Sequence, residues 1–249
     1  MTALYILNRH LTVFRRTFWA NLTFNFIEPF LYLSAMGLGL GSLITEINGM
    51  SYMQFIAPGM VASAGMWAAT FECTYSSFLR LHYQKTFHAV LCTPTTVVDV
   101  VIGDIVFGAL KSMVFGAIIL LVIGLWGQVQ SAWALTIPLF LVLPGLVFSL
   151  LGLSYTGITP HIDYLNYYIT LFITPLYLFS GIFFPISSMP AWVQTFAWFS
   201  PLFHSVEVCR ALVLGNITGS LWYHIAVLIG FIIVLAWVPV HLLQKRLIN

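Results

Sequence analysis

The sequence predicts an all-α polytopic membrane protein. Of its 249 residues, 60% are hydrophobic and only 6% are charged, whereas a soluble domain carries about 25% charged residues. Nine Lys and Arg with seven Asp and Glu side chains cannot cover a water-soluble globule of this size. Several apolar runs also reach the roughly 20 residues of a membrane helix. These features exclude a soluble enzyme, a nucleic-acid binder and a disordered chain.

The N-terminal segment 1–18 has the pattern of an interfacial helix. Its apolar residues recur at intervals of three and four and form one stripe, at Leu4, Leu7, Leu11, Phe14 and Phe18. Arg9, Arg15 and Arg16 lie off that stripe. We expect this helix to lie along the headgroup layer. A short helix that faces solvent is the alternative.

Six apolar segments are predicted as membrane spans. They cover residues 22–43, 55–78, 97–126, 132–159, 164–184 and 221–243. Prolines divide segment 185–220, between the fifth and sixth spans, into pieces at 191–199 and 203–214 that are too short to cross. We interpret this segment as a re-entrant helical hairpin. Two amphipathic surface helices are the alternative.

The Lys and Arg residues indicate the orientation of the spans. Seven of the nine lie near the two termini or in the 79–96 loop. Cations are enriched in cytoplasmic loops, so we expect both termini and the 79–96 loop in the cytoplasm. An even number of spans then places the 185–220 hairpin on the outer side.

Charged side chains also occur inside the predicted spans, where they are costly and by default functional. Besides Asp99, at the very start of the third span, they are Glu28, Glu72, Asp104 and Lys111. We expect them to form a polar cluster at the cytoplasmic end of the first three spans and to satisfy one another. The cluster is interpreted as a local ion network that couples helix movement, in preference to a transport relay.

The hairpin carries an ion pair of its own, and the chain lacks recognisable catalytic motifs. Glu207 and Arg210 are three residues apart, a spacing that pairs side chains on one helix face. A stabilising pair is favoured over a site for a substrate headgroup. The sequence contains no GxxxxGK[ST], HExxH or CxxC pattern. We therefore expect no catalytic residues and no metal site.

The whole chain resembles the membrane subunits of ABC type-2 exporters, and most closely the NodJ-like permeases that accompany a NodI ATPase in export of lipo-oligosaccharide (nodulation factor). Asp104 stands where Glu is frequent in that family, and Met189 where Leu is usual. The stretches that carry the resemblance include Glu28-Pro29-Phe30-Leu31, Ala68-Ala69-Thr70-Phe71-Glu72, Leu178-Phe179-Ser180-Gly181, Phe184-Pro185, Pro201-Leu202 and His204-Ser205.

The resemblance implies a type-2 ABC exporter fold, with membrane transport and ATP hydrolysis on separate subunits. The permease would be a homodimer in a bacterial inner membrane, resting on two copies of a separate NodI-like ATPase. ATP and Mg would bind that ATPase, with no cofactor on this chain. The 79–96 loop would couple the permease to the ATPase through exposed residues, namely Arg80, His82, Lys85, Thr86 and His88. As an alternative, these cations merely follow the positive-inside rule.

The hairpin would form the outer gate, with Ser180, Gly181, Pro185, Pro201, His204, Glu207 and Arg210 as its marked residues. The cargo would be a lipid-linked oligosaccharide, a glycolipid or a similar amphiphile, in contact with membrane lipids and not with nucleic acid. The main alternative is a proton-coupled secondary carrier of a small or amphipathic substrate, with the buried acids as a relay. Such carriers usually contain internal repeats, and none is visible between segments 20–126 and 132–243.

Overall fold

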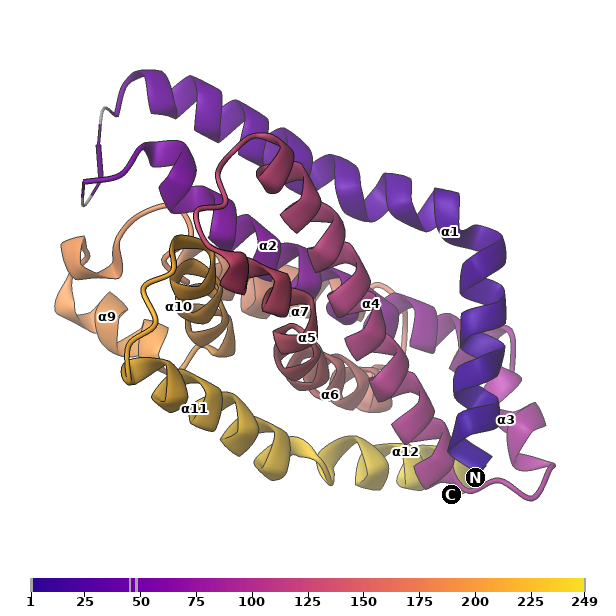
Figure 1. Cartoon of the computed structure of the whole chain (residues 1–249). Coiled ribbons are helices and arrows are strands. Elements are labelled where there is room, and N and C mark those ends of the chain that lie inside the picture. Colours follow the sequence, from indigo (N-terminus) through magenta and orange to yellow (C-terminus); the bar gives the residue numbers. More distant parts are fainter. Residues whose placement is uncertain (1, 45, 48, 249) are drawn as a thin grey trace.

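The computed structural model describes residues 2–44, 46–47 and 49–248, and these residues are almost entirely helical (Figure 1). Within them the only β-type pairing is an isolated bridge between Ile47 and Met50. The predicted all-α fold class is therefore confirmed.

The first helix, α1, extends from Thr2 to Ser34 without a break. A π-helical turn, Ala35–Gly39, and a 3-10 turn, Leu40–Ser42, follow it. The expected interfacial helix 1–18 and the start of span 22–43 thus belong to one helix, because no Gly or Pro interrupts residues 2–28. The ribbon of α1 nevertheless changes direction between its N-terminal part and the remainder (Figure 1).

Helix α2, Tyr52–Phe71, lies at the centre of the fold, and most of its residues are buried. It starts with a capping box in which Ser51 and Gln54 satisfy each other's backbone amides. Two π-helical turns extend it, η3 at Glu72–Ser76 and η4 at Leu79–Tyr83, and the short helix α3, Thr86–Leu91, comes next. π-turns inside helices occur frequently at functional sites.

The long helix α4, Val97–Leu125, packs against α1 and α2 and begins with a second capping box, formed by Thr96 and Asp99. The other elements are η5 (Ala132–Thr136), α5 (Ile137–Phe140), α6 (Val142–Ile158), α7 (Tyr164–Tyr168), η6 (Ile169–Ile173), α8 (Thr174–Leu178), η7 (Ile186–Ser188), α9 (Ala191–Trp198), α10 (Pro201–Leu214), α11 (Ser220–Leu235) and α12 (Val238–Ile248).

Three helical stretches in the described part of the chain are long and apolar enough to cross a membrane. They are Val97–Leu125, Ala132–Ile158 and Ser220–Leu247. The other segments expected as spans are also helical, but they are shorter or interrupted by π-turns. The count of six spans stays a prediction. Two short helices, α9 and α10, occupy the segment expected as a hairpin.

Both termini lie at one end of the molecule, together with α3 and the start of α4 (Figure 1). Arg246 near the C-terminus donates to the carbonyl oxygens of Thr156 and Gly157 at the end of α6, at 2.6 and 3.1 Å. A small apolar cluster that includes Phe87, Val101 and Leu243 fills this end, and a larger one fills the remainder. The charged site lies between α1, α2 and α4 at the same end.

Candidate functional site

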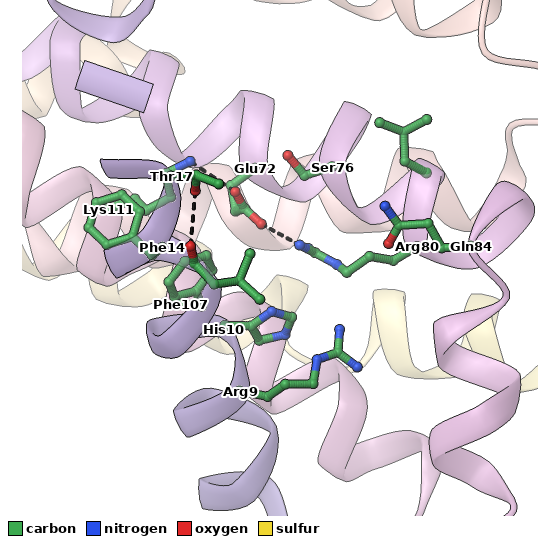
Figure 2. A pocket seen from close by; sticks show the side chains of 12 residues that line it. Arg9, His10, Phe14, Thr17, Glu72, Ser76, Arg80, Gln84, Phe107 and Lys111 are labelled. Atoms are coloured by element: carbon green, nitrogen blue, oxygen red, sulfur yellow. Dashed lines mark hydrogen bonds and ion pairs between the residues drawn. The ribbon is translucent and has the colours of Figure 1, made fainter. Parts of the chain in front are cut away.

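Buried charged side chains from three parts of the chain meet between α1, the π-turns after α2, and α4. Glu72 begins η3, and Arg80 lies in η4. Asp104 and Lys111 lie on α4 and are seven residues apart, so they share one face. His10 of α1 completes the group (Figure 2). All five side chains are buried, and Asp104 has no exposed surface.

Glu72 binds two cations at once. Its Oε1 accepts a hydrogen bond from Arg80 Nη1 at 2.6 Å, and its Oε2 accepts one from Lys111 Nζ at 2.9 Å. The Arg80 and Glu72 positions are eight residues apart, or about 12 Å of helix rise. Helical side chains point toward the N-terminus, and the long Arg80 side chain extends back along its helix to reach Glu72 (Figure 2).

Asp104 is the second anion of the network. Its Oδ2 accepts hydrogen bonds from Arg80 Nη2 at 3.0 Å and from Ser77 Oγ at 2.7 Å. Its Oδ1 lies 2.8 Å from Nε2 of His10. Arg80 therefore bridges the two carboxylates, and Asp104 ties α1 to α4. Removing one partner of a buried ion pair costs about 3–5 kcal/mol, because it leaves an uncompensated charge.

Two members of this network differ from the sequence-based expectation. The family resemblance places Arg80 among the exposed residues of the 79–96 loop, but its side chain is buried because it binds Glu72 and Asp104. Burial alone would lower the pKa of Arg80, but the Asp104 and Glu72 carboxylates hold it above its usual value. His10 is not among the predicted site residues, although its spacing of four from Ile6 and Phe14 indicates an inward face.

The structure brings Glu72, Asp104 and Lys111 together, with Arg80 between the two acids. In this arrangement Lys111 pairs with Glu72. The side chain of Glu28, the fourth expected member, lies outside the described residues.

The remainder of the 79–96 loop is more accessible. Lys85 and His88 are exposed and Thr86 is half-buried, while the neighbouring Phe87 anchors α3 in the small apolar cluster. His82 is half-buried, and its Nε2 lies 2.6 Å from Nη2 of Arg246. Burial and the charge of Arg246 lower the pKa of His82.

A second polar group lies in the 185–220 segment, at Arg210. Its guanidinium pairs with Glu207 three residues earlier, donates to the Gly181 carbonyl oxygen at 2.7 Å and lies 4.3 Å from the Phe55 ring centroid. One side chain thus joins α10 to α2 and to the turn after α8. Glu207 and Pro185 are half-buried, and Ser180, Gly181 and Pro201 are buried.

His204 of the same helix contacts two partners. Its Nε2 lies 2.9 Å from the Trp198 carbonyl oxygen, and its Nδ1 lies 2.7 Å from Nδ1 of His224. Because a carbonyl only accepts, Nε2 carries the proton and Nδ1 accepts from His224. Burial lowers the pKa of His204 and His224 lowers it further, against the opposite effect of the bond to Trp198.

These long apolar helices indicate a helical membrane protein, and the sequence identifies its family. Residues 3–214 match the profile of the ABC-2 type transporter family. The chain belongs to this family, and the resemblance noted above is confirmed. It is a membrane-spanning permease subunit of an ABC transporter, and its sequence lacks the GxxxxGK[ST] motif that binds ATP phosphates.

Curated relatives match nearly the whole chain. It is 35% identical to nodulation protein J of Rhizobium leguminosarum bv. trifolii over 97% of this chain and 92% of that protein. It is 33% identical to nodulation protein J of Rhizobium meliloti over 96% and 91%. It is 29% identical to the inner membrane transport permease YadH of Escherichia coli over 86% and 84%.

Proposed function

We propose that this chain, together with a separately encoded ATPase, forms an ATP-driven pathway that exports a lipid-linked oligosaccharide, a glycolipid or a similar amphiphile. The similarity to nodulation protein J supports this cargo class, and the similarity to an inner membrane permease supports location in a bacterial inner membrane. Two copies of the chain would rest on two ATPase subunits, which would bind ATP and Mg. Six spans with both termini in the cytoplasm complete the proposed topology.

Arg80 carries the mechanistic part of the proposal. It lies in η4, immediately before the exposed part of the loop, and it holds Glu72 and Asp104 together. Through Asp104 it is linked to His10 of α1 as well as to α4. A displacement of α3 by a docked ATPase would therefore reach α1, α2 and α4 through one buried side chain.

The docking surface would be the exposed side of the loop, with Lys85, Thr86 and His88. Phe87 of α3 is 2% exposed and packs into the small apolar cluster, so it holds this docking surface against the rest of the protein. Lys85 has φ +52°, a conformation that non-glycine residues adopt rarely and that fixes a sharp turn between η4 and α3. A push on α3 would therefore move η4 with it.

The pairing of the buried acids favours coupling over a proton relay. Glu72 contacts two cations and Asp104 contacts Arg80, Ser77 and His10, so neither is poised to exchange protons with a passing substrate. A proton-coupled carrier would instead place its acids beside a midplane cavity formed by broken helices.

The test is ATP-dependent transport in inverted membrane vesicles that contain the chain and its cognate ATPase. We expect a fluorescent lipid-linked oligosaccharide to accumulate in the vesicles only when ATP and both proteins are present. K85E and H88E should lower the ATPase stimulation by this chain, whereas R15Q, elsewhere on the cytoplasmic side, should not. Accumulation driven by a proton gradient without the ATPase would overturn the proposal in favour of the carrier.

A further inference from the structure

A cavity of about 230 Å³ opens beside the ion network, between α1, the two π-turns and α4. Cationic side chains from all three parts line it, namely Arg9, Arg80 and Lys111, together with His10 (Figure 2). Val13 and Leu79 form apolar walls and are 54% and 38% exposed. The carboxylate of Glu72 also lines the cavity, where it is paired with Arg80 and Lys111. The cavity therefore combines a mainly cationic interior with an apolar, accessible edge.

The charges around this cavity do not balance. Arg80 and Lys111 are paired with Glu72 and Asp104. Arg9 adds a further positive charge, and within the described residues no carboxylate lies within ion-pair distance of it. Burial and the nearby Arg80 lower the pKa of Arg9, against the opposite effect of the Asp104 carboxylate. The site therefore has a net positive charge that an anion would neutralise.

One buried donor next to the cavity also lacks a partner. Nε of Arg80 is buried and, within the described residues, makes no hydrogen bond. Leaving a buried charged donor unsatisfied is costly. Figure 2 shows the Arg9 side chain extending from α1 toward the side of the cavity where Arg80 lies. An anionic oxygen in the cavity would approach both guanidinium groups.

We propose that this cavity binds the phosphate of an anionic membrane phospholipid. Basic pockets between membrane helices on the cytoplasmic side recognise such headgroups. The adjoining surface of α1 favours a lipid over a soluble anion, because Tyr5, Val13 and Trp19 are 75%, 54% and 77% exposed on a helix that also carries Arg15 and Arg16. Acyl chains would lie along this apolar surface with the phosphate between Arg9 and Arg80.

The bound lipid would connect α1 with the η4 turn. Its phosphate would contact Arg9 on one side and Arg80 on the other, and Arg80 is the residue that holds Glu72 and Asp104. Anionic lipid would therefore stabilise the arrangement of α1, α2 and α4 independently of the cargo.

The test measures lipid binding to the full chain in detergent by native mass spectrometry, with phosphatidylglycerol and phosphatidylcholine as probes. We expect phosphatidylglycerol to be retained in preference. R9Q should lower its binding at least about fivefold, the effect of one cation near an anionic surface. R15Q, on the same helix but not at the cavity, should change binding less than twofold. V13E, which adds a carboxylate at the exposed edge, should lower binding as R9Q does.

Three results would overturn the proposal. Equal retention of the two lipids would show that the cavity does not select a charge. Equal losses in R9Q and R15Q would assign the preference to the general positive charge of α1. Thermal stabilisation by glycerol phosphate as large as that by phosphatidylglycerol would assign the site to a soluble anion.

Discussion

Neutralising Glu72 and Lys111 tests whether the buried charges act as one balanced unit. Glu72 and Asp104 oppose Arg80 and Lys111, so the formal charges of these four side chains sum to zero. E72Q leaves one excess positive charge, and K111M leaves one excess negative charge. The double substitution restores neutrality, with Arg80 still bound to Asp104 at 3.0 Å.

The expected losses follow from the number of contacts removed. E72Q deprives both Arg80 and Lys111 of a carboxylate, so it should cost about 3–5 kcal/mol in free energy of unfolding. K111M should cost about 2–3 kcal/mol, because Glu72 keeps its 2.6 Å contact to Arg80. The double variant should lose no more than E72Q alone, which corresponds to a coupling energy of about 2 kcal/mol or more.

The assay is unfolding of the purified chain in mixed micelles, followed by circular dichroism. A charge swap is less informative, because a lysine at position 72 would lie beside Arg80. Losses in E72Q and K111M that simply add, within about 0.5 kcal/mol, would refute the reasoning.

Three further predictions concern other parts of the chain. In the same unfolding assay, R210M should destabilise the protein by about 3 kcal/mol and E207Q by about 1 kcal/mol. The difference is expected because Arg210 also contacts a backbone carbonyl and an aromatic ring. Equal losses in the two variants would contradict this assignment. The folded state lowers the pKa of His82, so stability should fall as pH drops through its usual value of about 6.5, where the unfolded chain takes up the proton first. In H82Q the side-chain oxygen can still accept a hydrogen bond from Arg246. The melting temperature of this variant should therefore change less between pH 7.5 and 5.5 than that of the wild type, and an unchanged pH dependence would exclude His82 as its source. G215A should cost about 1 kcal/mol, because Gly215 ends α10 with φ +81°; an unaltered melting temperature would argue against that turn.

Much of the fold could be predicted, because the length of an apolar segment and the positions of prolines can be read directly from the sequence. The apolar run 97–126 forms α4 nearly to the residue. Pro190 lies directly before α9, and Pro201 is the first residue of α10. The continuity of α1 is not predicted by its composition. A change from amphipathic to apolar residues resembles a boundary, but it does not break the helical hydrogen bonds.

The site could be predicted only in part. Charged side chains inside apolar segments are recognisable because burying a charge in a membrane costs free energy. On this basis Glu72, Asp104 and Lys111 could be predicted as members of the site. Arg80 follows a predicted span and resembles an ordinary cytoplasmic cation. Its burial depends on the π-turns after α2 and on the position of α4, which are tertiary features. His10 is harder to predict, because its spacing of four from Ile6 and Phe14 indicates an inward face but does not identify Asp104 as its partner.

The most direct test of the coupling role is the ratio of ATP hydrolysed to cargo exported by the complete exporter with R80M. If Arg80 transmits movement from α3 to α1 and α4, the complex should assemble and hydrolyse ATP while export per ATP falls at least about tenfold. R16M, an exposed cation of α1, serves as the matched control and should keep the wild-type ratio. An R80M exporter with the wild-type ratio would contradict the account.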